Sequence, residues 1–357
     1  MDARRFCFWF EEISKDHTHT VGKKCANLGE MTRMGLPVPP GFAVSIAAYL
    51  RFIEETGAGR DMAQYVQALG EVRGRGIEIF EEMGRALKEM IEGREMPSYL
   101  KDEIEAYYGA LCRRTGIEDV PVSVRSAGVE SRPGMFDTYL NVSGIEEVLE
   151  KVKKVWTSAY TPRAIAFRVN KNLPILSDEL GVAIVKMVNA RSAGVAFTVK
   201  PVSGDTSKII IEANFGLGEG VVSGEEGVDR FIVDKETLEV VEEHVGKKTR
   251  YVVARKKGVE WEEVPAEKQV EACLSKEEVT EVARVARLLE ERLGCPQDVE
   301  WAIEADLPFP QNIFLLQTRP AKAVKGSTFE ALAQRMSTIH REIRIDKAQL
   351  KEIQFKF

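Results

Sequence analysis

Alternating hydrophobic and polar positions near the C-terminal end predict a strand with one buried face. Val299 and Trp301 alternate with Asp298 and Glu300, which is the period of two that a half-buried strand requires. A second run with the same alternation follows at residues 313–319. The two runs therefore predict neighbouring strands that present polar side chains on one common face.

The break between these runs predicts the tip of an antiparallel hairpin, because Leu307-Pro-Phe-Pro310 cannot continue a strand. In that hairpin Glu300 lies opposite Gln317, and Asp298 lies opposite Arg319. Carboxylate and amide oxygens suit Mg²⁺, and a guanidinium suits phosphate oxygens. The sequence therefore indicates a site for Mg²⁺ and polyphosphate, although a solvated sheet face with a surface ion pair explains the same four residues.

The rest of the chain divides into a mainly helical part followed by a strand-rich part. Apolar positions at helical spacing predict helices over residues 43–116, 145–169 and 328–343. Ser275 and Glu278 form a capping box for a further helix that Gly294 ends. Short apolar runs predict strands at residues 122–126, 181–188, 193–198, 207–215, 230–234 and 250–254. The last predicted helix, 328–343, has an apolar stripe that could contact a partner or its own chain.

Three loops have the composition of phosphate-binding segments. Gly22 and two lysines precede a helix, so that Lys24 could reach a phosphate. Residues 127–138 are rich in Gly, Ser and Thr and follow a strand that carries Arg125, with Arg132 in the loop itself. Residues 216–219 form a second glycine loop that allows a close backbone approach to a ligand. Each loop taken alone is also explained as a plain connection between elements.

Composition narrows the class of protein. At 357 residues the chain suggests two or three packed units. A net charge of −6, with both signs interspersed, argues against a nucleic-acid partner and against an anionic membrane surface. The five cysteines form no CxxC pair, and neither a signal peptide nor a membrane-spanning apolar run is present. We therefore expect a cytoplasmic protein with reduced thiols.

Taken together, the motifs resemble the ATP-binding N-terminal region of the phosphoenolpyruvate synthase and pyruvate phosphate dikinase family. The likeness runs from about Gly22 to Pro320. The matching blocks are Gly22-Lys-Lys-Cys-Ala-Asn-Leu-Gly-Glu-Met, Val124-Arg-Ser-Ala, Pro133-Gly-Met-Phe-Asp-Thr-Tyr-Leu-Asn, Phe215-Gly-Leu-Gly-Glu, Pro296-Gln-Asp-Val-Glu-Trp and Leu316-Gln-Thr-Arg-Pro. The resemblance implies an α+β ATP-grasp fold in which ATP lies in the cleft between two subdomains. We assign residues 1–180 and 181–322 to these subdomains and 323–357 to a helical tail.

The resemblance also implies a role for each candidate site residue. Glu300 and Gln317 would bind the metal as well as phosphate, with Asp298 beside them. Glu212 and Glu219 are similar to the acidic residues that the family places near the ribose and the metal. Lys24, Arg125 and Arg319 are expected to bind the phosphates and to act as catalytic cations. Arg163 is expected to bind the phosphates as well. The implied cofactors are ATP and Mg²⁺.

The chain departs from the family pattern after residue 320. The family enzymes continue into a domain whose histidine, in a Gly-Gly-x-x-Ser-His setting, is pyrophosphorylated by ATP, and then into a pyruvate-binding domain. The present chain ends at Phe357, and no such setting surrounds its four histidines, His17, His19, His244 and His340. We therefore expect an ATP-binding subunit that acts with a separate, histidine-bearing phospho-carrier subunit, which binds the small-molecule acceptor.

A division of this kind resembles the phenylphosphate synthases of anaerobic phenol degradation. That resemblance implies the reaction of phenol, ATP and water to phenylphosphate, AMP and phosphate. The alternatives are the ATP-binding subunit of a split phosphoenolpyruvate synthase and a non-catalytic ATP-binding regulator. The acceptor itself stays open, because the site that would bind it is not in the sequence.

Overall fold

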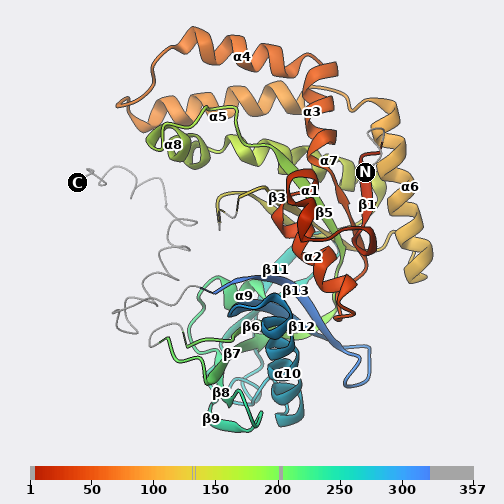
Figure 1. The fold of residues 1–357 in the computed structure, drawn as a ribbon, viewed down its shortest axis with the longest axis vertical. Helices are drawn as coiled ribbons and strands as arrows, with labels where there is room; N and C mark the ends of the chain where they lie inside the picture. The colour runs from red at the N-terminus through yellow and green to blue at the C-terminus, as the bar shows by residue number, and fades with distance from the viewer. Residues whose placement is uncertain (1–4, 131, 133, 201–203, 322–357) are drawn as a thin grey trace. The chain divides into compact units, whose positions relative to one another are not determined.

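The computed structural model describes residues 5–130, 132, 134–200 and 204–321 (Figure 1). The chain forms two compact units, which are described separately. Unit 1 comprises Met1–Met187 and Ala254–Val259, and unit 2 comprises Val188–Val253 and Glu260–Phe357. Both units combine helices with an antiparallel sheet, which confirms the predicted α+β class. The proposed tail, 323–357, and its helix lie outside the described residues.

Unit 1 is built on a five-stranded sheet in the order β1-β2-β5-β3-β4, with every neighbouring pair antiparallel. The sequence analysis did not predict β1, β2 and β4, which are short or lack a clear alternation. The strands are β1 (Cys7–Trp9), β2 (Gly41–Val44), β3 (Val122–Gly128), β4 (Thr138–Val142) and β5 (Leu180–Lys186). Strand β5 is central in this sheet, so the compact units divide after residue 187 and not at the expected position 180.

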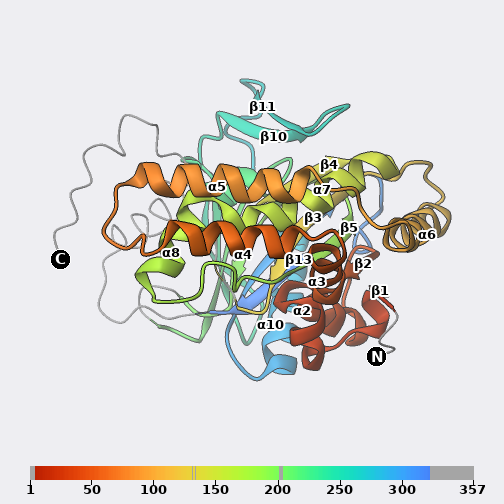
Figure 2. The same cartoon turned by 90° about the horizontal axis from the view of Figure 1, so that it is seen from above.

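The helices of unit 1 confirm most of the helical pattern predicted from residue 43 to 116 and from 145 to 169, although Ala43 and Val44 belong to β2. Helices α4 and α5 lie side by side (Figures 1 and 2), and α7 packs on β3, β4 and β5. Trp156 of α7 is fully buried, with Tyr49 and Phe52 of α3 against its ring. The helices are α1 (Thr18–Val21), α2 (Lys23–Arg33), α3 (Ile46–Glu55), α4 (Ala58–Leu69), α5 (Ile77–Glu92), α6 (Ser98–Thr115), α7 (Ile145–Thr157) and α8 (Pro162–Asn170), with 3-10 turns η1 (Phe10–Glu12), η2 (Lys15–His17) and η3 (Ser158–Tyr160).

Unit 2 is built on a six-stranded antiparallel sheet in the order β13-β12-β6-β7-β8-β9. Its strands are β6 (Ala190–Phe197), β7 (Lys208–Phe215), β8 (Asp229–Asp234), β9 (Val240–His244), β12 (Gln297–Glu304) and β13 (Ile313–Pro320). A two-stranded ribbon consists of β10 (Arg250–Ala254) and β11 (Val259–Glu263). The sequence analysis predicted most of these strands but not β9 and β11.

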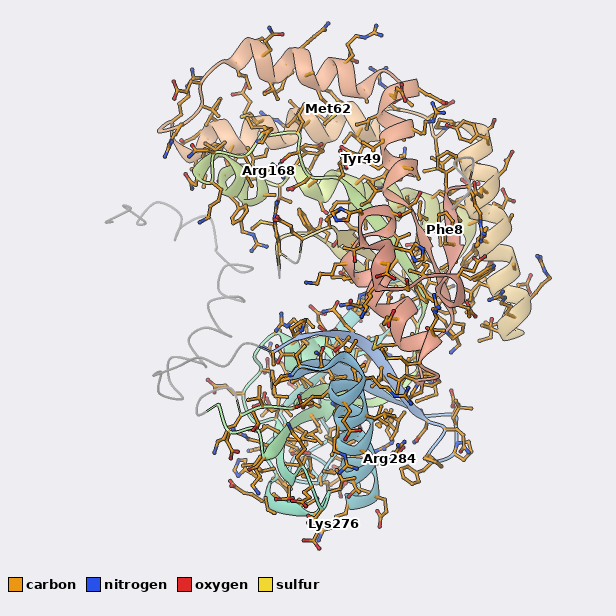
Figure 3. All side chains as sticks on the ribbon, viewed as in Figure 1. Phe8, Tyr49, Met62, Arg168, Lys276 and Arg284 are labelled. Carbon is orange, nitrogen blue, oxygen red and sulfur yellow. The ribbon has the colours of Figure 1, made fainter. Side chains whose placement is uncertain are left out.

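One long helix, α10 (Lys276–Leu293), packs on the sheet of unit 2, and Figure 3 labels Lys276 and Arg284 along it. Its capping box is formed as predicted: Glu278 N–H donates to Ser275 Oγ at 3.2 Å, and Ser275 N–H donates to Glu278 Oε2 at 2.9 Å. The helix ends at Gly294, whose φ of +72° favours glycine. A short helix, α9 (Glu219–Val222), follows the glycine loop after β7.

A fully buried ion pair joins three segments of unit 2. Lys248 Nζ donates to Asp229 Oδ1, and both side chains are 0% exposed. The same carboxylate accepts hydrogen bonds from Gly246 N–H at 3.0 Å and from Cys273 N–H at 2.7 Å. The pair therefore ties the start of β8 to the chain before β10 and to the chain before α10.

Within the described residues, no helix has both the length and the apolar character to cross a bilayer.

We predict that Asp229→Asn lowers the free energy of unfolding by about 3–5 kcal/mol, because it leaves the Lys248 ammonium buried without a counter-charge. Equilibrium unfolding in urea measures the change. The matched control is Lys208→Met, which removes a partly exposed pair with Asp234 and is expected to have a much smaller effect because solvent screens the two charges. Equal effects of the two substitutions would contradict a structural role for the buried pair.

Candidate functional site

The hairpin of β12 and β13 has the register that the sequence predicts. Glu300 pairs with Gln317, and Asp298 pairs with Arg319. Gln317 Nε2 donates to Glu300 Oε1 at 2.8 Å, and Arg319 Nε donates to Asp298 Oδ2 at 3.0 Å. A register shift follows directly after Glu300, so the regular pairing that aligns these four side chains ends at that point. The four residues therefore form two neighbouring cross-strand pairs on one face.

The same register continues across the whole sheet of unit 2. Residues that pair directly on adjacent antiparallel strands point to the same face. The row that contains the Glu300–Gln317 pair runs, from β13 to β9, through Gln317, Glu300, Val195, Glu212, Arg230 and His244. The structure thus brings Glu212 into line with the hairpin. It also adds Arg230, which the sequence analysis missed because only the pairing of β7 with β8 places it beside Glu212.

The opposite face of this sheet is apolar. Its side chains include the fully buried Ala196, Ile211, Phe231 and Trp301. Helix α10 packs on five strands of the sheet with an apolar stripe that includes Val282. We infer that α10 covers this apolar face, which leaves the row with Glu212 and Glu300 on the other face.

The carboxylates of the polar face lack full compensation of their charge. Burial raises the pKa of Glu212 above its ordinary value, and the positive charge of Arg230 offsets the rise only in part. Burial likewise raises the pKa of Asp298; Arg319 lowers it, and the nearby charge of Glu300 adds to the rise. A cation placed at this face would stabilise the ionised forms of both groups. Buried carboxylates whose pKa is raised are found at many functional sites.

The donor set of the Glu300–Gln317 pair fits Mg²⁺. A carboxylate and an amide oxygen are hard oxygen ligands, and Mg²⁺ is commonly held by one or two carboxylates together with substrate phosphates. Among the residues that the structure describes, no group of three or more His, Cys, Asp or Glu side chains is arranged to hold a metal without such help. The protein ligands therefore suit a metal that arrives with a polyphosphate.

Glu219 lies at the first position of α9, directly after the glycine loop. At Gly216, with φ +67°, an added Cβ would lie 2.2 Å from the carbonyl oxygen of Val252. Leu217 N–H donates to that same oxygen at 2.8 Å. The close approach expected at this loop is thus made by β10, so the requirement for glycine at residue 216 comes from packing within unit 2.

In unit 1, Lys24 and Arg125 lie close to one buried cysteine. Lys24 is the second residue of α2, and Arg125 is on β3. Burial raises the pKa of the Cys25 thiol to about 12, and the positive charges of Lys24 and Arg125 both act to lower it. The two predicted phosphate-binding cations, one at a helix N-terminus and one on a strand of the sheet, therefore both act on the same thiol.

Gly22 explains how α2 and β3 come so close. It precedes the helix with φ +81°, and an added Cβ would lie only 1.9 Å from the carbonyl oxygen of Ala127. No other residue type fits this contact without moving the backbone. The motif that starts at Gly22 thus seats the N-terminal end of α2, and with it Lys24, against the end of β3.

Arg163 lies in the first turn of α8, after Pro162 at the first helical position. Thr161 caps this helix, and its side chain accepts a hydrogen bond from Ala164 N–H at 3.3 Å. Arg163 is therefore presented by a third element of unit 1, separate from α2 and β3. Arg132, the arginine of the glycine-rich loop, donates to Asp178 at 2.5 Å and to Glu130 at 3.1 Å.

Comparison with known proteins identifies the family of this chain. The family model described as "Pyruvate phosphate dikinase, AMP/ATP-binding domain" matches residues 18–339. A probable phosphoenolpyruvate synthase of Staphylothermus marinus is 39% identical over 345 residues, which covers 88% of this chain and 41% of the relative. The phosphoenolpyruvate synthase of Aeropyrum pernix is 39% identical over 365 residues, which covers 93% of this chain and 44% of the relative.

A third relative, a probable phosphoenolpyruvate synthase of Archaeoglobus fulgidus, is 39% identical over 330 residues and is matched over 42% of its length. The chain thus spans less than half the length of these three relatives. The family model, in contrast, covers most of the present chain, including every candidate site residue. The chain therefore belongs to the family of the pyruvate phosphate dikinase AMP/ATP-binding domain.

Proposed function

We propose that this chain is the ATP-activating part of a dikinase-type phosphotransferase. In this reaction a pyrophosphoryl group passes from ATP to a histidine and AMP is released. Water then removes the terminal phosphoryl group as phosphate, and the phosphoryl group that remains passes from the histidine to the acceptor. The observation that carries the proposal is the pair of cross-strand contacts Glu300–Gln317 and Asp298–Arg319 on one sheet face. Family membership supports ATP as the nucleotide, and the ligand chemistry supports Mg²⁺ as its metal.

The proposed roles follow from charge. Phosphoryl transfer depends mainly on positioning and on positive charge placed where negative charge accumulates on the phosphate oxygens. In the proposal Lys24, Arg125, Arg163 and Arg319 supply this charge. Mg²⁺, when bound by Glu300 and Gln317, would neutralise further charge on the phosphates. Glu212 and Glu219 would bind the ribose and help to hold the metal.

Asp298 has an indirect role in this scheme. It accepts the hydrogen bond of Arg319 and so fixes the direction of the guanidinium beside Glu300. A planar guanidinium held by one of its edges keeps its remaining N–H donors in a rigid arrangement, which favours phosphate recognition. The pair is therefore suited to hold Arg319 ready before the nucleotide binds.

We further propose that the nucleophilic histidine is supplied by a phospho-carrier outside this ATP-binding region, either a separate subunit or another domain. No Gly-Gly-x-x-Ser-His sequence occurs in the chain. Nδ1 of His17 already accepts a hydrogen bond from Ser14 N–H at 2.9 Å, so this nitrogen serves a turn. A partner that docks and leaves requires a moderate, partly polar interface.

The three named relatives favour pyruvate as the acceptor, because each is named as a phosphoenolpyruvate synthase. We therefore put a phosphoenolpyruvate synthase-type reaction first and keep phenol, the acceptor of phenylphosphate synthesis, as an alternative outcome of the test. All five cysteines are unpaired, in keeping with the cytoplasmic location that we propose.

The proposed function predicts AMP as the nucleotide product. The chain is incubated with Mg²⁺, a histidine-bearing carrier and ATP labelled at the β-phosphate, and then with pyruvate or phenol. We expect the label on the carrier histidine, AMP in solution, and transfer of the label to one acceptor. ADP as the sole product would contradict the dikinase mechanism. Binding of ATP without turnover, with an active carrier present, would favour a non-catalytic regulator.

Glu300→Gln is expected to lower labelling of the carrier by about a thousandfold or more while leaving the fold intact. The amide keeps the size of the side chain and its contact with Gln317 but removes the charge that the metal requires. Circular dichroism and thermal unfolding check the fold. The matched control is Glu242→Gln on β9, an exposed acidic residue of the same sheet. Labelling at the wild-type rate in Glu300→Gln would remove this residue from the mechanism.

The buried negative charge of Glu212 is expected to lower the stability of the folded chain by an amount that depends on pH. Burial raises the pKa of Glu212 in the folded chain above its pKa in the unfolded chain. The contribution of Glu212 to the free energy of unfolding is therefore fully present below the unfolded pKa and is lost as the pH rises through the folded pKa. Glu212→Gln should therefore raise the Tm at pH 7 by roughly 2 °C and change it little near pH 3. Scanning calorimetry at both pH values measures this, with Glu242→Gln as the control that should stay flat. A lower Tm at pH 7 would show that the Glu212 charge is fully compensated.

A further inference from the structure

Asp178 of unit 1 lies buried between Arg132 and Arg168, to which the proposed function gives no role. Its Oδ1 accepts a hydrogen bond from Arg132 at 2.5 Å, and its Oδ2 accepts one from Arg168. The side chains of Asp178 and Arg132 are 7% and 13% exposed, and that of Arg168 is fully buried. One carboxylate thus bridges two guanidinium groups away from solvent, where charge-assisted hydrogen bonds are strong.

The three residues come from three different segments. Arg132 belongs to the loop between β3 and β4, Arg168 belongs to α8, and Asp178 lies just before β5. Figure 3 labels Arg168 on α8, facing the interior of unit 1. Strand β3 also carries Arg125, and α8 also carries Arg163. Asp178 therefore links α8, which carries Arg163, to the loop that follows the strand of Arg125.

Neighbouring contacts fix the geometry of the bridge. The Arg132 guanidinium lies 5.1 Å from the centre of the Phe167 ring of α8. Arg168 Nη2 donates to the carbonyl oxygen of Ala159 at 2.6 Å, and its guanidinium lies over the Tyr160 ring. Arg168 is thus held by its own surroundings, and the carboxylate between the two arginines has a defined position.

The loop side of the bridge is also defined. Met135 N–H donates to the carbonyl oxygen of Arg132 at 3.2 Å, which closes a turn, and Ser126 N–H donates to the carbonyl oxygen of Asp137 at 3.4 Å. Phe136 packs against the hydrophobic core of unit 1. The arginine therefore anchors a segment that returns directly to β3, one residue from Arg125.

The core does not require Arg132. The pair formed by Arg168 and Asp178 balances its charge without a further cation, whereas Arg132 adds a second positive charge from a loop. The exposed Glu130, at 3.1 Å from Arg132, offsets this added charge only at the surface. A buried second cation of this kind costs desolvation free energy, which a simple loop connection would not need. Its position is explained if the loop must be held in one place.

We propose that Arg132 and Asp178 are positioning residues, which hold the β3–β4 loop to α8 and so fix Arg125 and Arg163 for the phosphates of MgATP. This inference rests on the proposed function, because it concerns the same phosphate-binding groups. Neither residue contacts the nucleotide in the proposal. A loop that is ordered before binding spares the ordering cost at binding and keeps the cations in place during transfer.

The test uses the full chain with Arg132→Met, which leaves the Arg168–Asp178 pair intact and so preserves the core. The matched control is Glu130→Gln, which removes the exposed ion pair of the same loop without touching Asp178. Arg132→Lys keeps the charge with a less suitable geometry and serves as the rescue. If Arg132→Met does not fold, Arg132→Lys is measured in its place, and the same changes are expected at a smaller size.

Two independent measurements follow. Hydrogen exchange without nucleotide should become at least about tenfold faster at the amides of Gly134 to Asp137 in Arg132→Met. MgATP affinity, measured by titration calorimetry, should fall about three- to tenfold, and the turnover of carrier labelling should fall further than the affinity. Glu130→Gln should match the wild type in every readout, and Arg132→Lys should lie between the two.

Unchanged exchange in Arg132→Met would overturn the anchor. Faster exchange with wild-type affinity and turnover would show a merely structural role and would overturn the positioning role. If the wild-type chain itself fails to bind MgATP, the proposed function and the positioning role both fail, while the exchange comparison still decides whether Arg132 anchors the loop. The two failures are therefore distinguishable.

Discussion

The pairing of β12 with β13 is the constraint on which the candidate site depends most. It places Glu300 beside Gln317 and Asp298 beside Arg319, and β12 also pairs with β6 along its other edge. A slip of one residue would turn all four side chains to the apolar face that α10 covers. Because the fully buried Trp301 and Val299 hold the opposite face in the core, such a slip would cost a large part of the hydrophobic stabilisation. Core packing thus protects the register of the polar pairs.

Unit 2 contains two kinds of buried charge that differ in consequence. The Asp229 carboxylate accepts three hydrogen bonds, one of them from Lys248, and this arrangement holds segments of the fold together. Glu212 and Asp298 are compensated only in part, and burial raises the pKa of both. The first arrangement serves stability, whereas the second leaves negative charge available to a cation. The degree to which neighbouring groups compensate a buried carboxylate therefore distinguishes a structural acidic residue from one that could attract a cation, which the residue type alone does not.

Unit 1 places its cations by close backbone contact and by one shared carboxylate. Gly22 permits the contact that sets Lys24 near Arg125, and Asp178 links the loop after β3 to α8. Both contacts position backbone segments, and with them the side chains that we propose bind phosphate. Such positioning suits a reaction in which the protein contributes mainly placement and charge.

The sequence by itself determined the features that depend on near neighbours in the chain. The period of two and the proline-rich tip predicted the hairpin register, and the capping box predicted the start of α10. Three features were decided by the tertiary structure alone. They are the pairing of Arg230 with Glu212, the contact of Asp178 with Arg132, and the central position of β5 in the sheet of unit 1. These depend on which distant segments pair, and strand pairing leaves no local pattern in one sequence. A hairpin of two adjacent strands can be read from the chain because the short loop sets its register, whereas a buried carboxylate shared by a loop and a helix exists only once both are packed.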